Sequence, residues 1–313
     1  MRALALRAPL GVQVCAASCV TRCSTGCAGS TGCRWRWRSA SKMETRLFEK
    51  EEHAALYQKC RILIPPEIKN LVLSYLEEKK GKPFMLAVDV GCGTGQSTRV
   101  LAPHFQKVVG VDISEAQIKE AKKVVGPTNI SYCVCPAEEL PFEDGSVDLV
   151  LSSAAVHYFN IDKFITEVNR VLKPCGCMAF LTYTQYLEVH AKDCSDQLTA
   201  IYNEVEKSLV PFHSIKMRHV ISGYKEIFDA IPFPDKKRVG DIVCSMQLSI
   251  ADLLGFIESF GMFQVFLKKD PEAAKELLRK TEHRWLEAMK VSSKSAMVEI
   301  CLQYHCVLAC KPD

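Results

Sequence analysis

A glycine-rich loop between an apolar run and a helical pattern constrains the fold more than any other part of the chain. The apolar run Phe84–Val90 predicts a short buried strand, and Thr94–His104 has the pattern of a helix. Where they meet, the sequence reads Val88-Asp89-Val90-Gly91-Cys92-Gly93-Thr94-Gly95. Glycines permit a tight turn and a close approach of ligand to backbone, and the start of a helix presents free N–H groups. Strand, loop and helix in this order are typical of ligand sites in doubly wound α/β sheets.

The spacing of the glycines and two acidic residues indicate the kind of ligand. The third glycine, Gly95, gives G-x-G-x-G, whereas dinucleotide enzymes have G-x-G-x-x-G. Asp89 would repel phosphates but suits a ligand that carries a cation. Asp112 ends the next predicted strand, where a carboxylate can accept both hydroxyls of a ribose. Asp112 alone could cap a helix and the glycines alone could form a turn, but the combination favours a ligand site.

Apolar runs that alternate with helical segments predict a parallel sheet covered on both faces. After Phe84–Val90, the strands are expected at Lys107–Asp112, Ile130–Cys135, Val147–Ser153 and Cys177–Thr182. The regular alternation of apolar runs with helical segments ends after Tyr183. Helices are then expected at Asp196–Leu209, Ser222–Ala230, Ser249–Ser259 and Pro271–Met289, and strands at Val239–Gln247, Phe263–Leu267 and Val298–Ala309.

The first 42 residues differ in charge from the rest of the chain. They hold seven basic residues and no acidic one: Arg2, Arg7, Arg22, Arg34, Arg36, Arg38 and Lys42. The whole chain has 40 basic and 36 acidic residues, so the remainder is slightly acidic and offers no electrostatic footprint for nucleic acid. We expect residues 1–42 to be a disordered or targeting-like extension, either a transit peptide or an addition ahead of a start at Met43.

The cysteines and the apolar stretches indicate the cellular environment. Eleven of the sixteen cysteines lie after residue 59, mostly in apolar runs, which favours small buried thiols in a reducing compartment. The other five lie in the extension with no histidine nearby, so we expect no metal site. No apolar stretch reaches the length of about 20 residues that a membrane-spanning helix needs, so no membrane partner is expected. We expect a cytoplasmic protein, or a mitochondrial one if the extension is a genuine transit peptide.

The sequence resembles the class I S-adenosylmethionine-dependent methyltransferases. The resemblance rests on D-V-G-C-G-T-G at residues 89–95, on Val108–Asp112, on Ala137–Phe142 and Val147–Val150, and on Glu167–Pro174. It implies a Rossmann-like sheet of seven strands whose last strand is antiparallel, and S-adenosyl-L-methionine as cofactor. The methyltransferase domain would cover residues 43–313, with a core at 84–184 and 259–313 and a mostly helical insertion at 185–258.

The same resemblance implies a cofactor site drawn from the loop, the strand ends and the leading segment: Tyr57, Asp89, Gly91, Gly93, Gly95, Asp112, Ala137, Glu138 and Ser153. The glycines would pack against the methionine portion and the ribose, with Asp89 near the amino group and Asp112 on the ribose hydroxyls. Ala137 would meet the adenine edge and Ser153 the methionine end. Many members have Asp where this chain has Pro136, so the contact to the adenine amine is lost or passes to Glu138.

Three further stretches resemble a small-molecule branch that includes trans-aconitate methyltransferase. They are Leu47-Phe48 with His53–Arg61, Ala154–Phe159, and Leu248–Phe260 with Lys269-Asp270-Pro271. A carboxylate acceptor is already nucleophilic and needs a cation to hold it, for which Arg61 and Arg218 are candidates. A hydroxyl or amine acceptor would need a base, for which His157 is the candidate. Packing of His157 and solvation of Arg218 are the structural alternatives.

We therefore expect a methyltransferase that acts on a small molecule, with His157 and Arg61 as candidate catalytic residues. Two alternatives remain open at this point. A thiol or arsenic methyltransferase is suggested by cysteines expected near the ligand edge, namely Cys60, Cys92, Cys175 and Cys177. The other alternative is a non-catalytic protein that binds S-adenosylmethionine as a scaffold.

Overall fold

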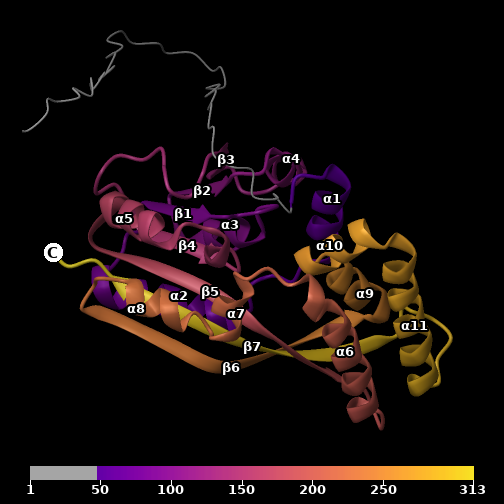
Figure 1. The fold of residues 1–313 in the computed structure, drawn as a ribbon. Coiled ribbons are helices and arrows are strands. Elements are labelled where there is room, and N and C mark those ends of the chain that lie inside the picture. The colour runs from indigo at the N-terminus through magenta and orange to yellow at the C-terminus, as the bar shows by residue number, and fades with distance from the viewer. Residues whose placement is uncertain (1–47) are drawn as a thin grey trace, which may run out of the picture. The chain divides into compact units, whose positions relative to one another are not determined.

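The computed structural model describes residues 48–313, which Figure 1 draws as the coloured ribbon. The expectations for residues 1–42 lie outside this range. The helices are α1 (Glu51–Cys60), α2 (Pro66–Lys80), α3 (Gln96–Leu101), α4 (Glu115–Lys123), α5 (Ile161–Val171), α6 (Ser195–Leu209), α7 (Met217–Ile221), α8 (Lys225–Ala230), α9 (Ile250–Glu258), α10 (Gly261–Lys269) and α11 (Pro271–Met289). The strands are β1 (Leu86–Val90), β2 (Lys107–Asp112), β3 (Ile130–Val134), β4 (Val147–Ser153), β5 (Leu172–His190), β6 (Asp235–Ser249) and β7 (Met297–Cys310).

The seven strands form one sheet in the order β3-β2-β1-β4-β5-β7-β6. Strands β1 to β5 pair in parallel, and β7 runs antiparallel to both of its neighbours. The expected doubly wound α/β sheet with an antiparallel last strand is therefore confirmed. The strand order reverses between β1 and β4, which is the place where open α/β sheets bind ligands beyond the carboxyl ends of their strands.

Each face of the sheet has its own hydrophobic core. On β4, Leu149 and Leu151 face one core, while Val150 between them faces the other. The first core is completed by α2, α6, α9 and α11, and the second by α5, α7 and α8. Because both faces are covered, the inner strands are largely apolar, and this is why the sequence shows them as apolar runs with few polar residues.

Two expectations about the second half of the chain are corrected. The predicted strand Phe263–Leu267 lies within helix α10, because a five-residue apolar run has the same appearance in a buried helix and in a strand. The strand predicted at Cys177–Thr182 continues to His190 as part of β5. Thr184 and Gln185 are both polar, and apolar and polar residues alternate from Leu187 to His190, so the continuous apolar signal ends before the strand does.

Residues 185–258 contain the end of β5, helices α6 to α9 and strand β6. The division into a core and a mostly helical insertion at these boundaries remains a proposal. Among residues 48–313 no single helix has the length and hydropathy to cross a membrane. Helices α9 and α10 have that length and hydropathy only when taken together, as a pair bent by 74°.

Candidate functional site

The glycine loop joins β1 to α3 at the carboxyl edge of the sheet. Gly91 and Gly95 have positive φ values of 69° and 79°, which favour glycine. A Cβ atom on Gly91 would lie 2.5 Å from the Cβ of Ala155, and one on Gly95 would overlap the hydroxyl of Tyr132. The amides of Gly91 and Cys92 both donate to the carbonyl of Val111, at 2.8 and 3.0 Å. The loop is therefore fixed to the end of β2 in a form that side chains would disturb.

Asp112 lies at the end of β2 with both carboxylate oxygens directed at backbone amides. Oδ2 accepts a hydrogen bond from Gly93 N and Oδ1 accepts one from Ser114 N, each at 2.8 Å. Burial raises the pKa of the Asp112 carboxyl, and the two amides lower it. Ser114 is the residue that caps α4, since its hydroxyl accepts from Gln117 N. The structure thus places Asp112 beside the loop, and its role toward a ribose remains a prediction.

Asp89 is fully buried at the end of β1 and has one unpaired oxygen. Its Oδ2 accepts a hydrogen bond from the Thr98 hydroxyl at 2.7 Å, whereas Oδ1 has no partner in the described part of the chain. Burial, with a smaller contribution from the Asp112 charge, raises the pKa of Asp89 to about 7. A buried carboxylate oxygen without a partner is unfavourable, and an ammonium group would satisfy it.

A second unpaired acceptor faces the same loop. Gln117, in the first turn of α4, is 2% exposed and its Oε1 has no partner among the described residues. A Cβ atom added to Gly93 would lie 3.5 Å from this oxygen and 3.6 Å from the ring of Tyr57. No motif in the sequence points to Gln117, although the cap at Ser114 indicates that Gln117 lies in the first turn of α4, beside the loop. The two unpaired acceptors fit a ligand that offers N–H groups or an ammonium.

The predicted adenine side lies after β3. Ala137 is 7% exposed, and the Oε1 atom of Glu138 accepts from the amide of Asn160 at 2.7 Å. Glu138 thus fixes the start of α5, and its contact with adenine remains a prediction. Ser153 ends β4 in register with Leu181 of β5, at the carboxyl edge of the sheet.

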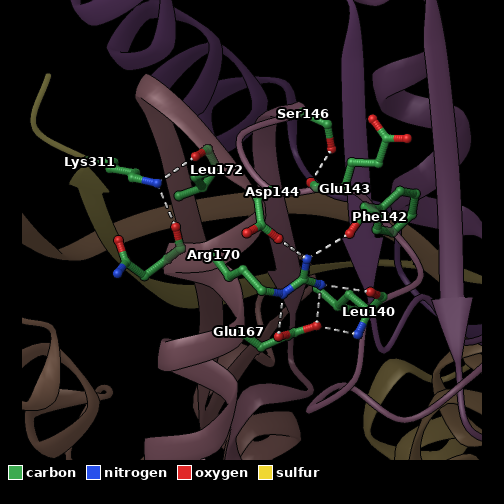
Figure 2. A network of polar contacts seen from close by, with 10 residues as sticks. Leu140, Phe142, Glu143, Asp144, Ser146, Glu167, Arg170, Leu172 and Lys311 are labelled. Atoms are coloured by element: carbon green, nitrogen blue, oxygen red, sulfur yellow. Dashed lines mark hydrogen bonds and ion pairs between the residues drawn. The ribbon is translucent and has the colours of Figure 1, made fainter. Parts of the chain in front are cut away.

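Arg170 of α5 anchors the segment that follows Ala137, as Figure 2 shows. Its guanidinium donates to the carbonyls of Leu140 and Phe142 at 3.0 and 2.8 Å. It also pairs with Asp144 and Glu167, at 2.6 and 2.7 Å. Glu167 in turn accepts from the amide of Leu140 at 2.7 Å. Arg170 and Glu167 therefore hold this loop in place from one turn of a single helix.

The segment from Phe48 through α1 covers the glycine loop. The Phe48 carbonyl accepts from the Ser114 hydroxyl at 2.8 Å, and Glu51 pairs with Lys119 of α4 at 2.7 Å. At the other side, His53 Nε2 lies 3.0 Å from the carbonyl oxygen of Ser259. Tyr57, predicted from the resemblance to line the cofactor site, lies on this helix beside Gly93.

Arg61 follows α1 and is enclosed by aromatic rings. Its guanidinium carbon lies between 4.8 and 5.9 Å from four ring centroids, those of Tyr57, Tyr183, Phe256 and Phe260. Its Nη1 also donates to the Ser259 hydroxyl at 3.3 Å. The described residues give this guanidinium no ion pair with a carboxylate. Cation–π contacts stabilise the charge without neutralising it.

The other two residues expected to act on the methyl acceptor, Arg218 and His157, have different surroundings. Arg218 is exposed and its Nε lies 3.6 Å from a carboxylate oxygen of Glu226, which is the surface alternative. His157 is 5% exposed and its Nδ1 lies 2.9 Å from the Tyr224 hydroxyl. Burial, followed by smaller contributions from His219, Lys216 and Arg61, lowers the pKa of His157 to about 3, so the imidazole is neutral at physiological pH. Its role as a base remains a prediction.

Two of the four cysteines expected near the ligand edge lie elsewhere. Cys175 is close to the start of β5, and its thiol donates to an Asp313 oxygen at 2.9 Å. Cys177 pairs in register with Leu149 of β4. Both belong to the amino ends of the parallel strands, so the expectation was wrong for them. Cys92 belongs to the glycine loop with its sulfur against Gly110 of β2, and Cys60 packs against Gly255, so the four thiols form no common site.

Comparisons with known proteins agree with this geometry. Residues 88–180 match the profile of a family described as "Methyltransferase domain". A relative from Dictyostelium discoideum, named a "putative methyltransferase", is 25% identical over 82% of this chain and 92% of its own length. The chain is an S-adenosylmethionine-dependent methyltransferase. Its cofactor is S-adenosylmethionine, and the unpaired oxygens of Asp89 and Gln117 fit the amino groups of that molecule.

Two further similarities were found, one in sequence and one in fold. A "probable S-adenosylmethionine-dependent methyltransferase" of Saccharomyces cerevisiae is 32% identical over 45% of this chain. The match spans 49%, about half, of the yeast protein's length. A solved structure named "putative type II methyltransferase" from Anaeromyxobacter dehalogenans shares the fold, with a TM-score of 0.64 and 22% identity over 80% of this chain and 98% of its own.

Proposed function

We propose that this methyltransferase transfers the methyl group to the carboxylate of a small molecule. The observation that carries the proposal is the Arg61 guanidinium, half-buried among aromatic rings and without a carboxylate partner in residues 48–313. A cation held away from water is stabilised when a counterion joins it. The planar guanidinium matches a carboxylate with two parallel hydrogen bonds, whereas a neutral acceptor would leave the charge unpaired.

The position of Arg61 supports its assignment to the acceptor. Tyr57, whose ring lies under the guanidinium, also borders Gly93 of the glycine loop. Tyr183 on β5 lies two residues beyond Leu181, which pairs with Ser153 at the end of β4. Arg61 therefore stands beside the strand ends where the methionine portion of the cofactor is proposed to lie. We keep the cofactor assignments of the other residues, from Asp89 to Ser153, as part of this proposal.

The proposed reaction asks little chemistry of the protein. When bound, S-adenosylmethionine supplies a methyl group on a positively charged sulfur, and the thioether that leaves needs no proton. A carboxylate is already nucleophilic, so Arg61 has to hold and orient it and no residue has to remove a proton. The neutral, buried His157 is consistent with this, because its Nδ1 is engaged with Tyr224. Helix α1 covers the loop and keeps water away from the reacting groups.

The three stretches that resemble the trans-aconitate methyltransferase branch support the same proposal. All three segments contribute to the surroundings of Arg61 or of the glycine loop. Phe256, Ser259 and Phe260 come from the last segment, and Tyr57 from the first. The identity of the acid is left to experiment.

A panel of mono-, di- and tricarboxylic acids, incubated with cofactor labelled on the methyl group, tests the proposal. The expected product is a methyl ester, detected because base releases its label as methanol. Arg61→Gln should lower kcat/KM for that acid by roughly 10- to 100-fold, the value of a charge-assisted pair. Cofactor affinity should stay within about twofold, since within residues 48–313 no hydrogen bond or ion pair joins the Arg61 side chain to the loop.

Arg218→Gln is the matched control, because it removes a guanidinium that is exposed and already beside Glu226. It should leave turnover unchanged. A base-stable labelled product, or equal kcat/KM in Arg61→Gln and the unaltered protein, would overturn the carboxylate assignment while leaving the methyltransferase itself in place.

We also propose a cytoplasmic location for a chain that starts at Met43, and mitochondrial import where residues 1–42 act as a transit peptide. Fluorescent fusions of residues 1–313 and 43–313 distinguish these two cases. Identical distributions of the two fusions would contradict a targeting role for the extension.

A further inference from the structure

Three chemically different side chains meet on the distal part of the β5–β7 ladder, far from the glycine loop. One ligand-type atom from each of Glu188, His190 and Cys301 lies within 4.8 Å of the other two. The Nε2 atom of His190 is 3.0 Å from a carboxylate oxygen of Glu188. His190 and Cys301 are half-buried and Glu188 is exposed.

The backbone explains why these side chains meet. Residues two apart on a strand share a face, so Glu188 and His190 point the same way. Cys301 is paired with Glu188 across the antiparallel ladder and therefore lies on that face as well. The residues between them, Val189 on β5 and Ile300 on β7, are buried in the core on the other face. A shift of register would expose these apolar residues, so the fold holds the cluster in place.

We propose that Glu188, His190 and Cys301 bind a divalent transition-metal ion of the zinc class. A thiolate, an imidazole and a carboxylate together are the donors that Zn²⁺ prefers, whereas Mg²⁺ and Ca²⁺ take oxygen donors. Three protein ligands leave the fourth tetrahedral position to water. The two negative charges of Glu188 and the Cys301 thiolate match the charge of the ion, and the thiol proton passes to solvent on binding.

Two neighbouring features suit such an ion. Glu299 lies opposite His190 in the ladder and adds a negative charge beside the cluster. His190 and Glu299 also line a surface cavity of about 540 Å³, through which an ion and its water can enter. The nine residue steps from Leu181 to His190 put the cluster about 30 Å along β5 from the predicted methyl site, so the ion would join β5 to β7 without taking part in methyl transfer.

Titration with Co²⁺, a spectroscopic substitute for Zn²⁺, tests the proposal. The protein is the full chain in which the cysteines of the extension are changed to serine: Cys15, Cys19, Cys23, Cys27 and Cys33. One equivalent of Co²⁺ should give a thiolate-to-metal charge-transfer band and the strong visible absorption of a four-coordinate site. Cys301→Ser should abolish the charge-transfer band, and His190→Ala should weaken Co²⁺ binding at least tenfold.

Cys175→Ser is the matched control, because Cys175 lies on β5 at the opposite end from Glu188 and His190 and contacts a carboxylate of Asp313 outside the cluster. It should leave the band unchanged. In a second measurement, Zn²⁺ should raise the Tm of the unaltered chain and of Cys175→Ser, but not of Cys301→Ser or His190→Ala. Absence of Co²⁺ binding at micromolar protein, or a band that survives Cys301→Ser, would overturn the proposal. Neither outcome bears on methyl transfer, which the ester assay measures separately.

Discussion

Replacement of Asp89 by asparagine tests the electrostatics of the cofactor site most directly. Asp89 is fully buried, and burial raises its pKa from 3.8 to about 7. A carboxyl whose pKa is raised by folding contributes stability below its unfolded value of 3.8, and this contribution is lost as the pH rises through 7. Asp89→Asn removes the titration and keeps the shape, so its effect on stability should depend on pH.

The magnitude follows from the two pKa values. Each unit of difference corresponds to about 1.4 kcal/mol, so the shifted titration of Asp89 lowers the free energy of unfolding by roughly 4 kcal/mol at pH 8. At pH 5, where only the unfolded chain ionises this group, it lowers the free energy of unfolding by roughly 1.5 kcal/mol. Asp89→Asn should therefore gain roughly 2 to 3 kcal/mol on the unaltered protein between pH 5 and pH 8. Effects of the substitution that do not depend on pH, such as a weaker hydrogen bond to Thr98, cancel when the two pH values are compared.

Urea unfolding of the ligand-free protein at both pH values measures the effect. Calorimetric titration with S-adenosylmethionine supplies the functional half: affinity should rise with pH up to about 7 in the unaltered protein, because the ammonium needs the ionised carboxylate. In Asp89→Asn affinity should be weak and independent of pH around neutrality. A stability change that is the same at pH 5 and pH 8 would refute the reasoning.

Three other predictions use single substitutions. Asp112→Ala should weaken cofactor binding by roughly 1 to 3 kcal/mol in calorimetry, and unchanged affinity would mean that the ribose is misplaced. Gly91→Ala should lower the Tm by several degrees, because the methyl group would meet Ala155 at 2.5 Å, whereas Gly126→Ala, with its nearest contact at 3.7 Å, should change it little. Arg170→Ala should lower the free energy of unfolding by about 1 to 2 kcal/mol and speed proteolysis of the loop after residue 140. Lys311 donates to the carbonyls of Asn169 and Leu172, outside this loop, so Lys311→Ala should not affect that cleavage.

Local sequence signals predict the central strands well because those strands are buried on both faces. The bounds expected for β2 and β4, Lys107–Asp112 and Val147–Ser153, agree with the structure. The distal part of β5 was not predicted because one of its faces is polar. Helix α10 was predicted as a strand because its packing against α11 and η3 (Val210–Phe212), and not its local sequence pattern, determines its secondary structure.

The candidate site shows the same division. The loop and the strand-end acids are local to one strand–loop–helix–strand unit, so Asp89, Gly93 and Asp112 were predicted to lie together and do so. The surroundings of Arg61 come from segments more than 100 residues away, at Tyr183 and Phe256. Only folding brings such segments together, so Arg61 could be predicted from the sequence, whereas the rings that enclose it could not.

The aromatic enclosure of Arg61 has a consequence for turnover. Esterification removes the negative charge that pairs with the guanidinium, so the product loses the main attraction that held the substrate. On the proposed reaction, the methyl ester should be a poor competitive inhibitor, and a non-reactive dianion such as a phosphonate should be a strong one. The same side chain would thus favour capture of the acid and discharge of the ester, without any change in the shape of the protein.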